Sequence, residues 1–504
     1  MKMTKKEIPV RLEMRAEAVK ERIRHFREFV KPLTEKEAVQ QSQRCLHCGT
    51  PYCAAQCPLH NRPVDFNQWV KDGRWHAAWD ALTATNPFPE FTSRLCPALC
   101  ESGCTEYLLE GAAVGIRSVE RVITERAWKS GWVTPMRPLS KTGKRVAVVG
   151  SGPAGLACAQ HLVRLGHEVT VFEKTPKAGG LLRYGIPDFK LEKALIDRRL
   201  EQLQAEGVIL KTSVAVGVKT FEPGIYSGAT EFVDASDLRQ GFDAVVLAAG
   251  VETPRDWDLP GRQAQGIHFA LELLIGQNRV TAGEAVGTEI SCRGCDVLVL
   301  GGGDTGSDCI GVARRQGAGR IVQVARSPEP PAIDEGRKSW PKPAAVRHTS
   351  TSQEEGCERL WGLVAKEFLT DEKGAVRGVR FARLKWTPDA ATGRMKAEET
   401  TEAPVEIAAQ KVFLAIGFSR PTSGLADAFG LRTDERGYVV TKPNGIGAFC
   451  AAEGIFVCGD MRRGPALVAS ALYDGKRCAE AVNAFLIEMS AQTCDFSRGS
   501  SRRF

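Results

Sequence analysis

The stretch RVAVVGSGPAGLACAQHLVRLGHEVTVFEK, from Arg145 to Lys174, decides the fold. Its first part, the apolar run 146–149, indicates a buried parallel strand that ends at the first of three glycines. Gly150, Gly152 and Gly155 have the G-x-G-x-x-G spacing that opens a helix in a dinucleotide-binding unit. The first glycine permits a tight turn, the second lets the backbone approach a pyrophosphate, and the third lets the helix pack against the strand. The stretch therefore predicts a dinucleotide site at a helix N-terminus, where unpaired N–H groups attract anions.

A second strand, 169–172, ends in Glu173, whose carboxylate can accept hydrogen bonds from ribose hydroxyls. The alternative is a glycine-rich turn between strand and helix that binds no ligand. The combination of strand, glycines, helix and terminal acid argues against that alternative. We count Pro153 and Ala154, which lie between the glycines, among the expected cofactor-binding residues.

The length of 504 residues predicts several domains, because a single hydrophobic core stops growing at about 250 to 300 residues. A hydrophobic content of 43% and a charged content of 25% are typical of a soluble globular protein. The sequence has neither an apolar leader nor an apolar run near the roughly 20 residues of a membrane span, so we expect a cytoplasmic protein without membrane contact. The net charge of +8 is small for this length and dispersed, which favours a protein partner with an acidic face over nucleic acid.

Cysteine is concentrated near the N-terminus, where seven of the 16 cysteines fall between Cys45 and Cys104. In a chain expected to be cytoplasmic, this favours metal ligation over disulfides. The first group has the pattern C-x2-C-x4-C-x3-C-P, a close variant of the bacterial ferredoxin pattern. Two iron–sulfur clusters fit the two groups, and the alternative is structural zinc. The groups are Cys45, Cys48, Cys53 and Cys57, followed by Pro58, and then Cys96, Cys100 and Cys104.

These cysteine groups and four longer motifs resemble the small (β) subunit family of glutamate synthase. The motifs are NPFPEFTSRLCPALCESGC at 86–104, GGLLRYGIPDFK at 179–190, GGGDTGSDC at 301–309 and CGDMRRG at 458–464. The same cysteine framework is found in the N-terminal part of dihydropyrimidine dehydrogenase. The resemblance covers nearly the whole chain. It implies FAD, NADPH and two 4Fe-4S clusters as cofactors, and the large (α) subunit of glutamate synthase as partner.

The resemblance also implies how the ligands divide between two clusters. One cluster takes the first three cysteines and the last, which here are Cys45, Cys48, Cys53 and Cys104. The seven cysteines are one short of two four-cysteine sites, so the other cluster needs a different fourth ligand. An alternative for that residue is a surface glutamate on a helix that begins near Ser118. The expected second set is Cys57, Cys96, Cys100 and, sixteen residues beyond the last cysteine, Glu120.

A second glycine-rich motif follows the predicted strand 296–300 and repeats the spacing of the first. This internal repeat predicts two dinucleotides close enough to exchange a hydride. At the end of the next strand, 321–325, Ala325 takes the place of Glu173 and Arg326 follows it. A guanidinium binds a 2′-phosphate bidentately, so we expect NADPH; the alternative is an arginine merely exposed at a strand end. The expected nicotinamide contacts are Gly301, Gly302, Gly303, Asp304, Thr305, Arg326 and Ser327, with Gly306 as the third glycine of the motif.

Two further strands, 243–250 and 412–417, end in small residues, a pattern common where the chain crosses between two dinucleotide-binding domains. They predict a nicotinamide domain inserted into the flavin domain, with Ala415 and Gly417 near the cofactor. The fold class is therefore α/β, with a helical iron–sulfur domain followed by two Rossmann-like domains. The expected divisions are 1–140 for the iron–sulfur domain, 141–255 and 419–490 for the FAD domain, 256–418 for the NADPH domain, and 491–504 for a disordered tail.

The resemblance implies further contacts to FAD. The loop 179–190 would lie against the flavin, and Asp460 would hold the ribityl chain. A helix over 465–472 would direct its N-terminus at the flavin pyrimidine and stabilise negative charge on the reduced ring. The implied contacts are Lys174, Gly180, Leu181, Lys190, Gly459, Asp460, Ala466 and Leu467.

Two other segments carry expectations of structure only. Residues 1–30 have helical spacing and mixed charge, which favours a solvated helix packed on its own domain. Residues 66–82 also have helical periodicity, in which Trp69, Trp75 and Trp79 are more typical of a core than of electron relays.

The cysteines outside the N-terminal groups are expected to be structural. Cys158, Cys309 and Cys478 lie on predicted helical faces and behave as small buried apolar residues. Cys292 and Cys295 form a C-x2-C pair before the second glycine motif. A redox dithiol would have to abut the flavin, so incidental placement is the favoured interpretation.

Together these residues predict an electron-input subunit, in which NADPH reduces FAD and two clusters carry single electrons to a partner that makes glutamate from glutamine and 2-oxoglutarate. Hydride transfer requires stacking and orientation rather than a protein acid or base, so no catalytic side chain is expected. One alternative is a related NAD(P)H-dependent subunit with another acceptor. Another, from a different class, is a non-catalytic scaffold whose clusters are structural.

Overall fold

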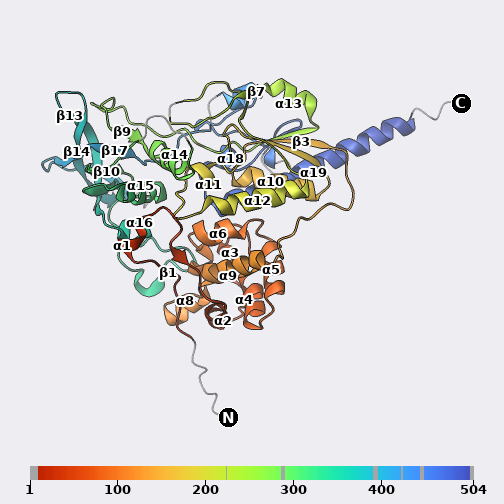
Figure 1. Cartoon of the computed structure of the whole chain (residues 1–504), viewed down its shortest axis with the longest axis horizontal. Coiled ribbons are helices and arrows are strands. Elements are labelled where there is room, and N and C mark those ends of the chain that lie inside the picture. The colour runs from red at the N-terminus through yellow and green to blue at the C-terminus, as the bar shows by residue number, and fades with distance from the viewer. Residues whose placement is uncertain are drawn as a thin grey trace, which may run out of the picture.

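The chain folds into three parts that lie against one another (Figure 1). The structure is a computed structural model that describes residues 9–222, 224–284, 290–389, 395–421, 424–442 and 448–499, with side chains up to 489. We call the parts the helical domain, the six-stranded domain and the five-stranded domain. Within the described ranges, no helix is both long and apolar enough to cross a membrane.

The helical domain contains both cysteine groups and packs its short helices around one core. The periodicity of 66–82 is divided between two helices, because Gly73, with a φ of +72°, turns the chain between them. Trp75 and Trp79 are buried in this core, as expected, and Trp69 is partly buried against it. The helices are α2 Glu35–Ser42, α3 Tyr52–Gln56, α4 Pro63–Lys71, α5 Trp75–Thr83, α6 Pro89–Leu95, α7 Leu99–Ser102, α8 Thr105–Glu110 and α9 Ile116–Lys129.

The six-stranded domain is built on a sheet with the order β18-β19-β8-β3-β4-β5, parallel except for β18. Alternate residues of the central strand face opposite cores: Val146 and Val148 pack on one side, and Ala147 and Val149 on the other. The strands are β3 Arg145–Val149, β4 Glu168–Phe172, β5 Ile209–Lys211, β8 Ala244–Leu247, β18 Cys450–Ala452 and β19 Ile455–Val457, with a separate pair β6 Val214–Val216 and β7 Glu231–Val233. The helices are α10 Pro153–Arg164, α11 Leu181–Tyr184, α12 Lys193–Glu206, α13 Ala235–Gly241, α17 Leu425–Ala428, α18 Asp460–Arg463 and α19 Val468–Gly499.

The five-stranded domain has a parallel sheet with the order β12-β11-β10-β17-β9. Val297 and Val299 face helices α14 and α15, whereas Leu298 and Leu300 face an antiparallel sheet that contains Phe368. The parallel strands are β9 Ile267–Phe269, β10 Val297–Leu300, β11 Ile321–Ala325, β12 Glu358–Trp361 and β17 Lys411–Leu414. The antiparallel strands are β13 Leu363–Thr370, β14 Val376–Pro388, β15 Met395–Glu399 and β16 Val405–Ala408, and the helices are α14 Ala270–Thr281, α15 Asp304–Gln316, η1 Glu335–Arg337 and α16 Thr351–Glu354.

The chain crosses between the two sheet domains twice, and the crossings run side by side. The backbone N–H of Arg255 donates to the carbonyl of Gly417 at 3.0 Å, and that of Ser419 donates to the carbonyl of Thr253 at 2.9 Å. Strands of the six-stranded sheet therefore come from both sides of the five-stranded domain in sequence. This is the insertion that the two small-residue strand ends predict.

The N-terminal segment is not the helix that its spacing predicts. Residues 1–8 lie outside the described residues, and the segment that follows contains one helical turn, α1 (Val19–Arg22), and two antiparallel strands, β1 (Arg15–Ala16) and β2 (Val30–Lys31). Nor does it pack only on its own domain, because Phe29 belongs to the core of the five-stranded domain. These contacts to another domain replace the helical hydrogen bonds that local spacing favours.

The C-terminal end also differs from expectation. The expected helix over 465–472 begins three residues later, at Val468, because Gly464, with a φ of +82°, and Pro465 precede it. The expected disordered tail is wrong as far as the backbone is described, since α19 continues to Gly499. Residues 500–504 lie outside the described residues.

Candidate dinucleotide and iron–sulfur sites

A cavity of about 1060 Å³ lies where the three parts meet. Its walls come from the helical domain, from the first glycine-rich loop (150–155) and from Asp304 and Thr305, where the second glycine-rich motif (301–306) enters α15. The expected cofactor residues that line it are Gly150, Gly152, Pro153, Glu173, Lys174, Gly180, Leu181, Lys190, Asp460, Ala466, Leu467, Asp304 and Thr305. The residues expected for two cofactors thus share one continuous space.

The three glycines of the first loop have two different roles. A Cβ on Gly150, whose φ is +103°, would lie 2.5 Å from the carbonyl oxygen of Ala248, and one on Gly155 would lie 2.0 Å from that of Gly150. A Cβ on Gly152 would meet no atom within 4 Å. The outer glycines are therefore required for packing, whereas the middle one leaves the space open to a pyrophosphate.

Glu173 ends β4 with both carboxylate oxygens engaged. One oxygen accepts hydrogen bonds from the backbone N–H and hydroxyl of Ser151, at 3.0 and 2.5 Å. The other accepts from the backbone N–H and hydroxyl of Thr175, at 2.9 and 2.8 Å. These contacts fix the carboxylate at the edge of the cavity, where remaining lone pairs can accept from ribose hydroxyls. The sequence interpretation did not single out Ser151 or Thr175, although Ser151 stands inside the glycine motif.

The two expected lysine contacts are both paired with acids. The Lys174 ammonium lies 2.5 Å from a carboxylate oxygen of Glu252, on the first crossing segment. Lys190 forms a close ion pair with Asp308, on α15 of the five-stranded domain. Both lysines line the cavity, so their charges are available to a cofactor phosphate while the acids hold their positions.

The C-terminal contacts surround the start of α18. Asp460 lines the cavity, and burial raises the pKa of its carboxyl to about 7, against a hydrogen bond from the Ala466 backbone that lowers it. The backbone N–H of Gly459 donates to Asp474 at 2.7 Å. Leu467 precedes α19, whose N-terminal turn faces the cavity as expected for the helix near the flavin.

The second glycine-rich loop repeats the geometry of the first. A Cβ on Gly301, whose φ is +130°, would lie 2.1 Å from the carbonyl oxygen of Ala415, and one on Gly306 would lie 2.6 Å from that of Gly301. A Cβ on Gly303 would meet no atom within 4 Å. Ala415 therefore acts through its backbone, as Ala248 does in the first unit, and the middle glycine again leaves space for a ligand.

Arg326 stands exposed at the end of β11, outside the lining of the large cavity. Its guanidinium carbon lies 5.8 Å from the ring centroid of Trp386, and the Trp386 indole N–H donates to the Arg326 carbonyl at 3.2 Å. Among the described residues, no carboxylate forms an ion pair with Arg326. Ser327 contributes its carbonyl, which accepts from the backbone N–H of Gly362. The guanidinium is thus placed at the strand end, and in the described part of the chain it has no acidic partner.

The N-terminal cysteines gather round two small cavities. Cys45, Cys48, Cys53 and Cys104 line one, and Cys57, Cys96, Cys100 and Glu120 line the other. The chain thus brings together the two sets that the resemblance implies. Within the described residues, no group of three Cys, His, Asp or Glu side chains is arranged to hold a single metal ion.

Glu120 is not the surface glutamate of the alternative interpretation. It lies on α9, is 6% exposed and accepts one hydrogen bond, from the Asn61 side chain at 3.0 Å. Burial raises the pKa of its carboxyl to about 7, and burial likewise raises the pKa of the Cys57 thiol to about 11. Buried groups with raised pKa values ionise only beside compensating positive charge, which an iron–sulfur cluster supplies to its ligands, so three thiols and a carboxyl around one space fit such a cluster. Asn61 carries no sequence signal that would have identified it.

The second cysteine cavity adjoins the large cavity. Ala98 and Arg117 line both, and the Arg117 guanidinium donates to the carbonyl of Cys96 at 2.8 Å. The first cysteine cavity lies farther along the helical domain, where Leu46 and Tyr52 line it and are 41% and 38% exposed. One cysteine set therefore borders the expected flavin site, and the other borders the molecular surface.

Five of the other cysteines were given expected positions by the sequence, and the structure agrees with these. Cys158, Cys309 and Cys478 are fully buried. Cys292 is also fully buried, Cys295 is partly exposed, and neither lines the large cavity.

Comparison with known proteins agrees with this geometry. Residues 144–475 match the family described as pyridine nucleotide-disulphide oxidoreductase, and residues 22–132 match dihydropyrimidine dehydrogenase domain II, 4Fe-4S cluster. The glutamate synthase [NADPH] small chain of Mycobacterium tuberculosis is 40% identical over 93% of this chain and 93% of its own length. The chain belongs to the glutamate synthase small-chain family. It shares with that family the α/β fold and the 4Fe-4S domain.

Two further similarities extend the comparison. The glutamate synthase [NADH] of Saccharomyces cerevisiae is 37% identical over 93% of this chain, but the match covers 21% of the yeast protein. Relatives of the small-chain family therefore include proteins named for either nicotinamide coenzyme. Among solved structures, FprA from Mycobacterium tuberculosis in complex with NADPH has a TM-score of 0.52 and 19% identity, over 70% of this chain and 86% of that one. That likeness shows the fold of the two sheet domains.

Proposed function

We propose that the chain is the electron-input subunit of a glutamate synthase, which oxidises NADPH through FAD and delivers electrons through two 4Fe-4S clusters. The single cavity that joins both glycine-rich loops to the wall of a cysteine site carries this proposal. FAD supplies the chemistry of accepting a hydride and releasing single electrons. The protein's own task is to hold, orient and shield the cofactors, so we assign no catalytic side chain.

We assign the cavity residues to two groups, one for each nucleotide. The first loop, with Glu173 and Asp460, would hold FAD, and the second loop would hold the nicotinamide dinucleotide. Arg326 would bind the 2′-phosphate of NADPH, because its guanidinium is exposed at the strand end and stacks near Trp386. The shared cavity would then accommodate both ring systems in one continuous space.

The cluster assignments follow the two cysteine cavities. We assign Cys57, Cys96, Cys100 and Glu120 to the cluster beside the flavin, and Cys45, Cys48, Cys53 and Cys104 to the cluster near the surface. Electrons would leave the chain beside Leu46 and Tyr52, which line the cavity of Cys45 and are exposed. The large subunit would dock there.

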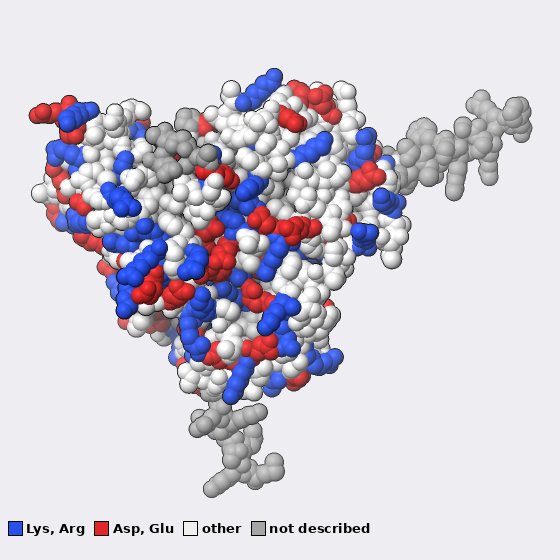
Figure 2. Space-filling view, in the orientation of Figure 1, with Lys and Arg blue, Asp and Glu red and all other residues white. Residues whose placement is uncertain are grey.

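The large (α) subunit of glutamate synthase is the proposed acceptor. The match covers 21% of the yeast protein, so most of that protein's length has no counterpart in the match with this chain. The face shown in Figure 2 has acidic and basic side chains intermixed rather than one basic patch, which suits a protein partner better than nucleic acid. The division into domains at residues 140, 255, 418 and 490 and a cytoplasmic location stay predictions.

Reconstitution with the large subunit tests the proposal. The purified chain, mixed anaerobically with its native large subunit, should support NADPH-dependent formation of glutamate from glutamine and 2-oxoglutarate. The large subunit without this chain should show none of that NADPH-dependent activity. If NADPH reduces the flavin but the mixture forms no glutamate, a related acceptor replaces glutamate synthase.

A further inference from the structure

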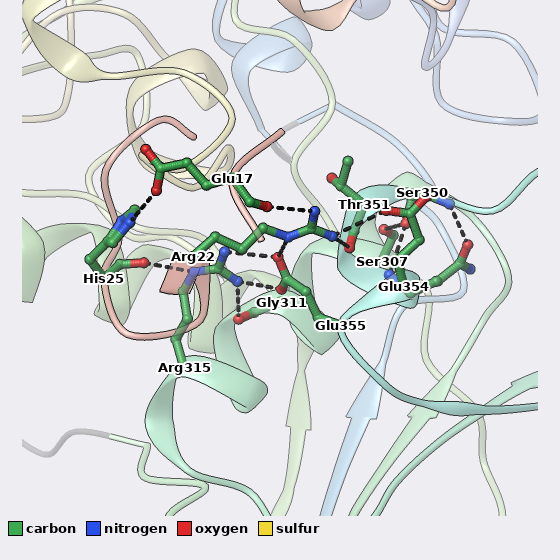
Figure 3. A network of polar contacts seen from close by, with 11 residues as sticks. Glu17, Arg22, His25, Ser307, Gly311, Arg315, Ser350, Thr351, Glu354 and Glu355 are labelled. Atoms are coloured by element: carbon green, nitrogen blue, oxygen red, sulfur yellow. Dashed lines mark hydrogen bonds and ion pairs between the residues drawn. The ribbon is translucent and has the colours of Figure 1, made fainter. Parts of the chain in front are cut away.

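A buried cluster of charges joins the N-terminal segment to the five-stranded domain (Figure 3). The Glu355 carboxylate accepts from the Arg22 guanidinium at 2.8 Å and from the Arg315 guanidinium at 2.6 and 3.0 Å. The side chains of Arg22, Glu355 and Arg315 are 3%, 0% and 0% exposed. Three ionised groups withdrawn from water in this way hold a fixed geometry, because any shift leaves a charge unpaired.

Each of the two arginines also donates a hydrogen bond to a backbone carbonyl of the other part of the chain. Arg22, on α1, donates to the carbonyl of Thr351 at 2.7 Å, and Arg315, on α15, donates to the carbonyl of His25 at 2.8 Å. Figure 3 shows the two guanidinium groups converging on Glu355 from different elements. The N-terminal segment is thus fastened to α15 and α16 of the five-stranded domain in both directions.

The six-stranded domain holds the same helix from another side. The Arg315 guanidinium lies 3.9 Å from the ring centroid of Phe189, in the loop expected to contact the flavin. A Cβ on Gly311, in the middle of α15, would lie 2.6 Å from that ring. Glycine destabilises a helix interior relative to alanine, so its presence here is explained by the close approach of Phe189. Lys190 and Asp308 add an ion pair across the same contact.

Helix α15 is the element that begins at the second glycine-rich loop. Whatever fixes α15 relative to the six-stranded domain therefore fixes the nicotinamide site relative to the flavin site. Hydride transfer demands reacting atoms about 3 to 3.5 Å apart, and a displacement of about 1 Å can cost a hundredfold in rate. A contact that fixes the position of α15 consequently also fixes the distance between the nicotinamide and the flavin.

We propose that Arg22 is a positioning residue for hydride transfer: through Glu355 and Arg315 it fixes helix α15, and with it the bound nicotinamide, against the flavin domain. This rests on the proposed assignment of the second glycine-rich loop to the nicotinamide nucleotide. The N-terminal segment, which precedes the cysteine groups, thereby acts on the flavin step and not only on the clusters.

The test compares Arg22→Met with Arg24→Met in the intact protein. Methionine retains the unbranched stem of Arg22 as far as the position of Nε, removes the guanidinium, and leaves both residues of the Arg315–Glu355 pair in place. Arg24 is a matched control, because its side chain is 72% exposed and its ion pair is with Glu21 on the same turn. Flavin content, iron content and flavin reduction by dithionite should be unchanged in both variants.

In Arg22→Met we expect the rate of flavin reduction at saturating NADPH to fall roughly tenfold to a hundredfold, with the NADPH concentration for half-maximal rate changed less than about threefold. Amide hydrogen exchange should rise in α1 and α16 but not in β3. Arg22→Lys, which restores the charge but not the forked donor geometry, should recover part of the rate.

A saturated rate equal to that of the unaltered protein, together with faster exchange in α1 and α16, would show that the cluster is only structural and would overturn the proposal. A change confined to the NADPH concentration dependence would likewise overturn it. If Arg22→Met does not retain flavin or iron, Arg22→Lys is judged by the same criteria. Failure of NADPH to reduce the flavin of the unaltered protein would refute the proposed function instead.

Discussion

The two nucleotide sites differ in the residue at equivalent strand ends, which is Glu173 in the first and Ala325 in the second. In the first unit the carboxylate accepts hydrogen bonds from Ser151, and in the second the residue in the place of Ser151 is Gly302. The second unit therefore lacks the acid and the hydroxyl of Ser151, although Ser327 stands in the place of Thr175. Arg326, exposed beside Trp386, is the charged group left at that strand end.

This difference predicts the coenzyme preference. A charge-assisted pair between Arg326 and the 2′-phosphate should contribute on the order of 1.5 to 3 kcal/mol, which is roughly tenfold to a hundredfold in kcat/KM for NADPH over NADH. The double change Ala325→Glu with Arg326→Leu should reverse the preference, because the new carboxylate would repel a 2′-phosphate and could accept hydrogen bonds from the ribose hydroxyls of NADH. Steady-state reduction of an artificial acceptor with each coenzyme gives the two kcat/KM values and hence the preference. Equal efficiency with NADH and NADPH in the unaltered protein would contradict the role of Arg326.

The sequence predicts site residues that belong to a motif with a fixed spacing. It does not predict single residues that reach the site from elsewhere in the chain. The cysteine sets and Glu120 are recognisable because a motif fixes their order, and the chain gathers them round two cavities. Asn61 donates to Glu120 from 59 positions away, and nothing in its neighbours marks it. Such partners are defined only when packing brings distant segments together.

At the scale of elements, the two strand–loop–helix units were predictable because strand burial, glycine spacing and helix start agree with one another. In both units the first and third glycines meet backbone atoms at distances that exclude a side chain, and the middle one meets none. The middle glycine can therefore be changed without disturbing the fold, which separates binding from folding experimentally.

Gly303→Val should abolish flavin reduction by NADPH while FAD stays bound, because the added methyls would occupy the space left for the pyrophosphate. Gly276→Val, in α14, is a matched control, since a Cβ there also meets no atom within 4 Å. Flavin absorbance of the purified variants and stopped-flow reduction by NADPH provide the measurements. Loss of flavin from Gly303→Val would mean that the two loops hold the opposite cofactors.

The elements that sequence periodicity predicts wrongly are those whose surroundings decide their structure. Residues 1–30 have helical spacing, but the described part from residue 9 onward contains a single helical turn, because Arg22 and Phe29 are buried against the five-stranded domain. The C-terminal helix α19 extends to Gly499 through a segment whose composition predicts disorder. The periodicity and composition of a segment predict neither its contacts with another domain nor the continuation into it of a helix that begins earlier.

At the scale of the whole molecule, the order of parts along the chain does not correspond to their order in space. The sequence predicts an insertion, and the paired crossing segments show how it is made. It does not predict that Arg22 and Phe29 reach the five-stranded domain, or that the helical domain forms one wall of the shared cavity. These contacts place both nucleotide loops and one cysteine site around the same space, as an electron-input subunit requires.

The sharpest test is the visible absorbance spectrum of the anaerobically purified chain, recorded before and after NADPH is added. We expect a flavin band superimposed on broad iron–sulfur absorbance, and prompt bleaching of the flavin band by stoichiometric NADPH. A chain that contains FAD and iron but whose flavin band is unchanged by NADPH would contradict the proposed function, because the shared cavity would then not join two communicating nucleotide sites.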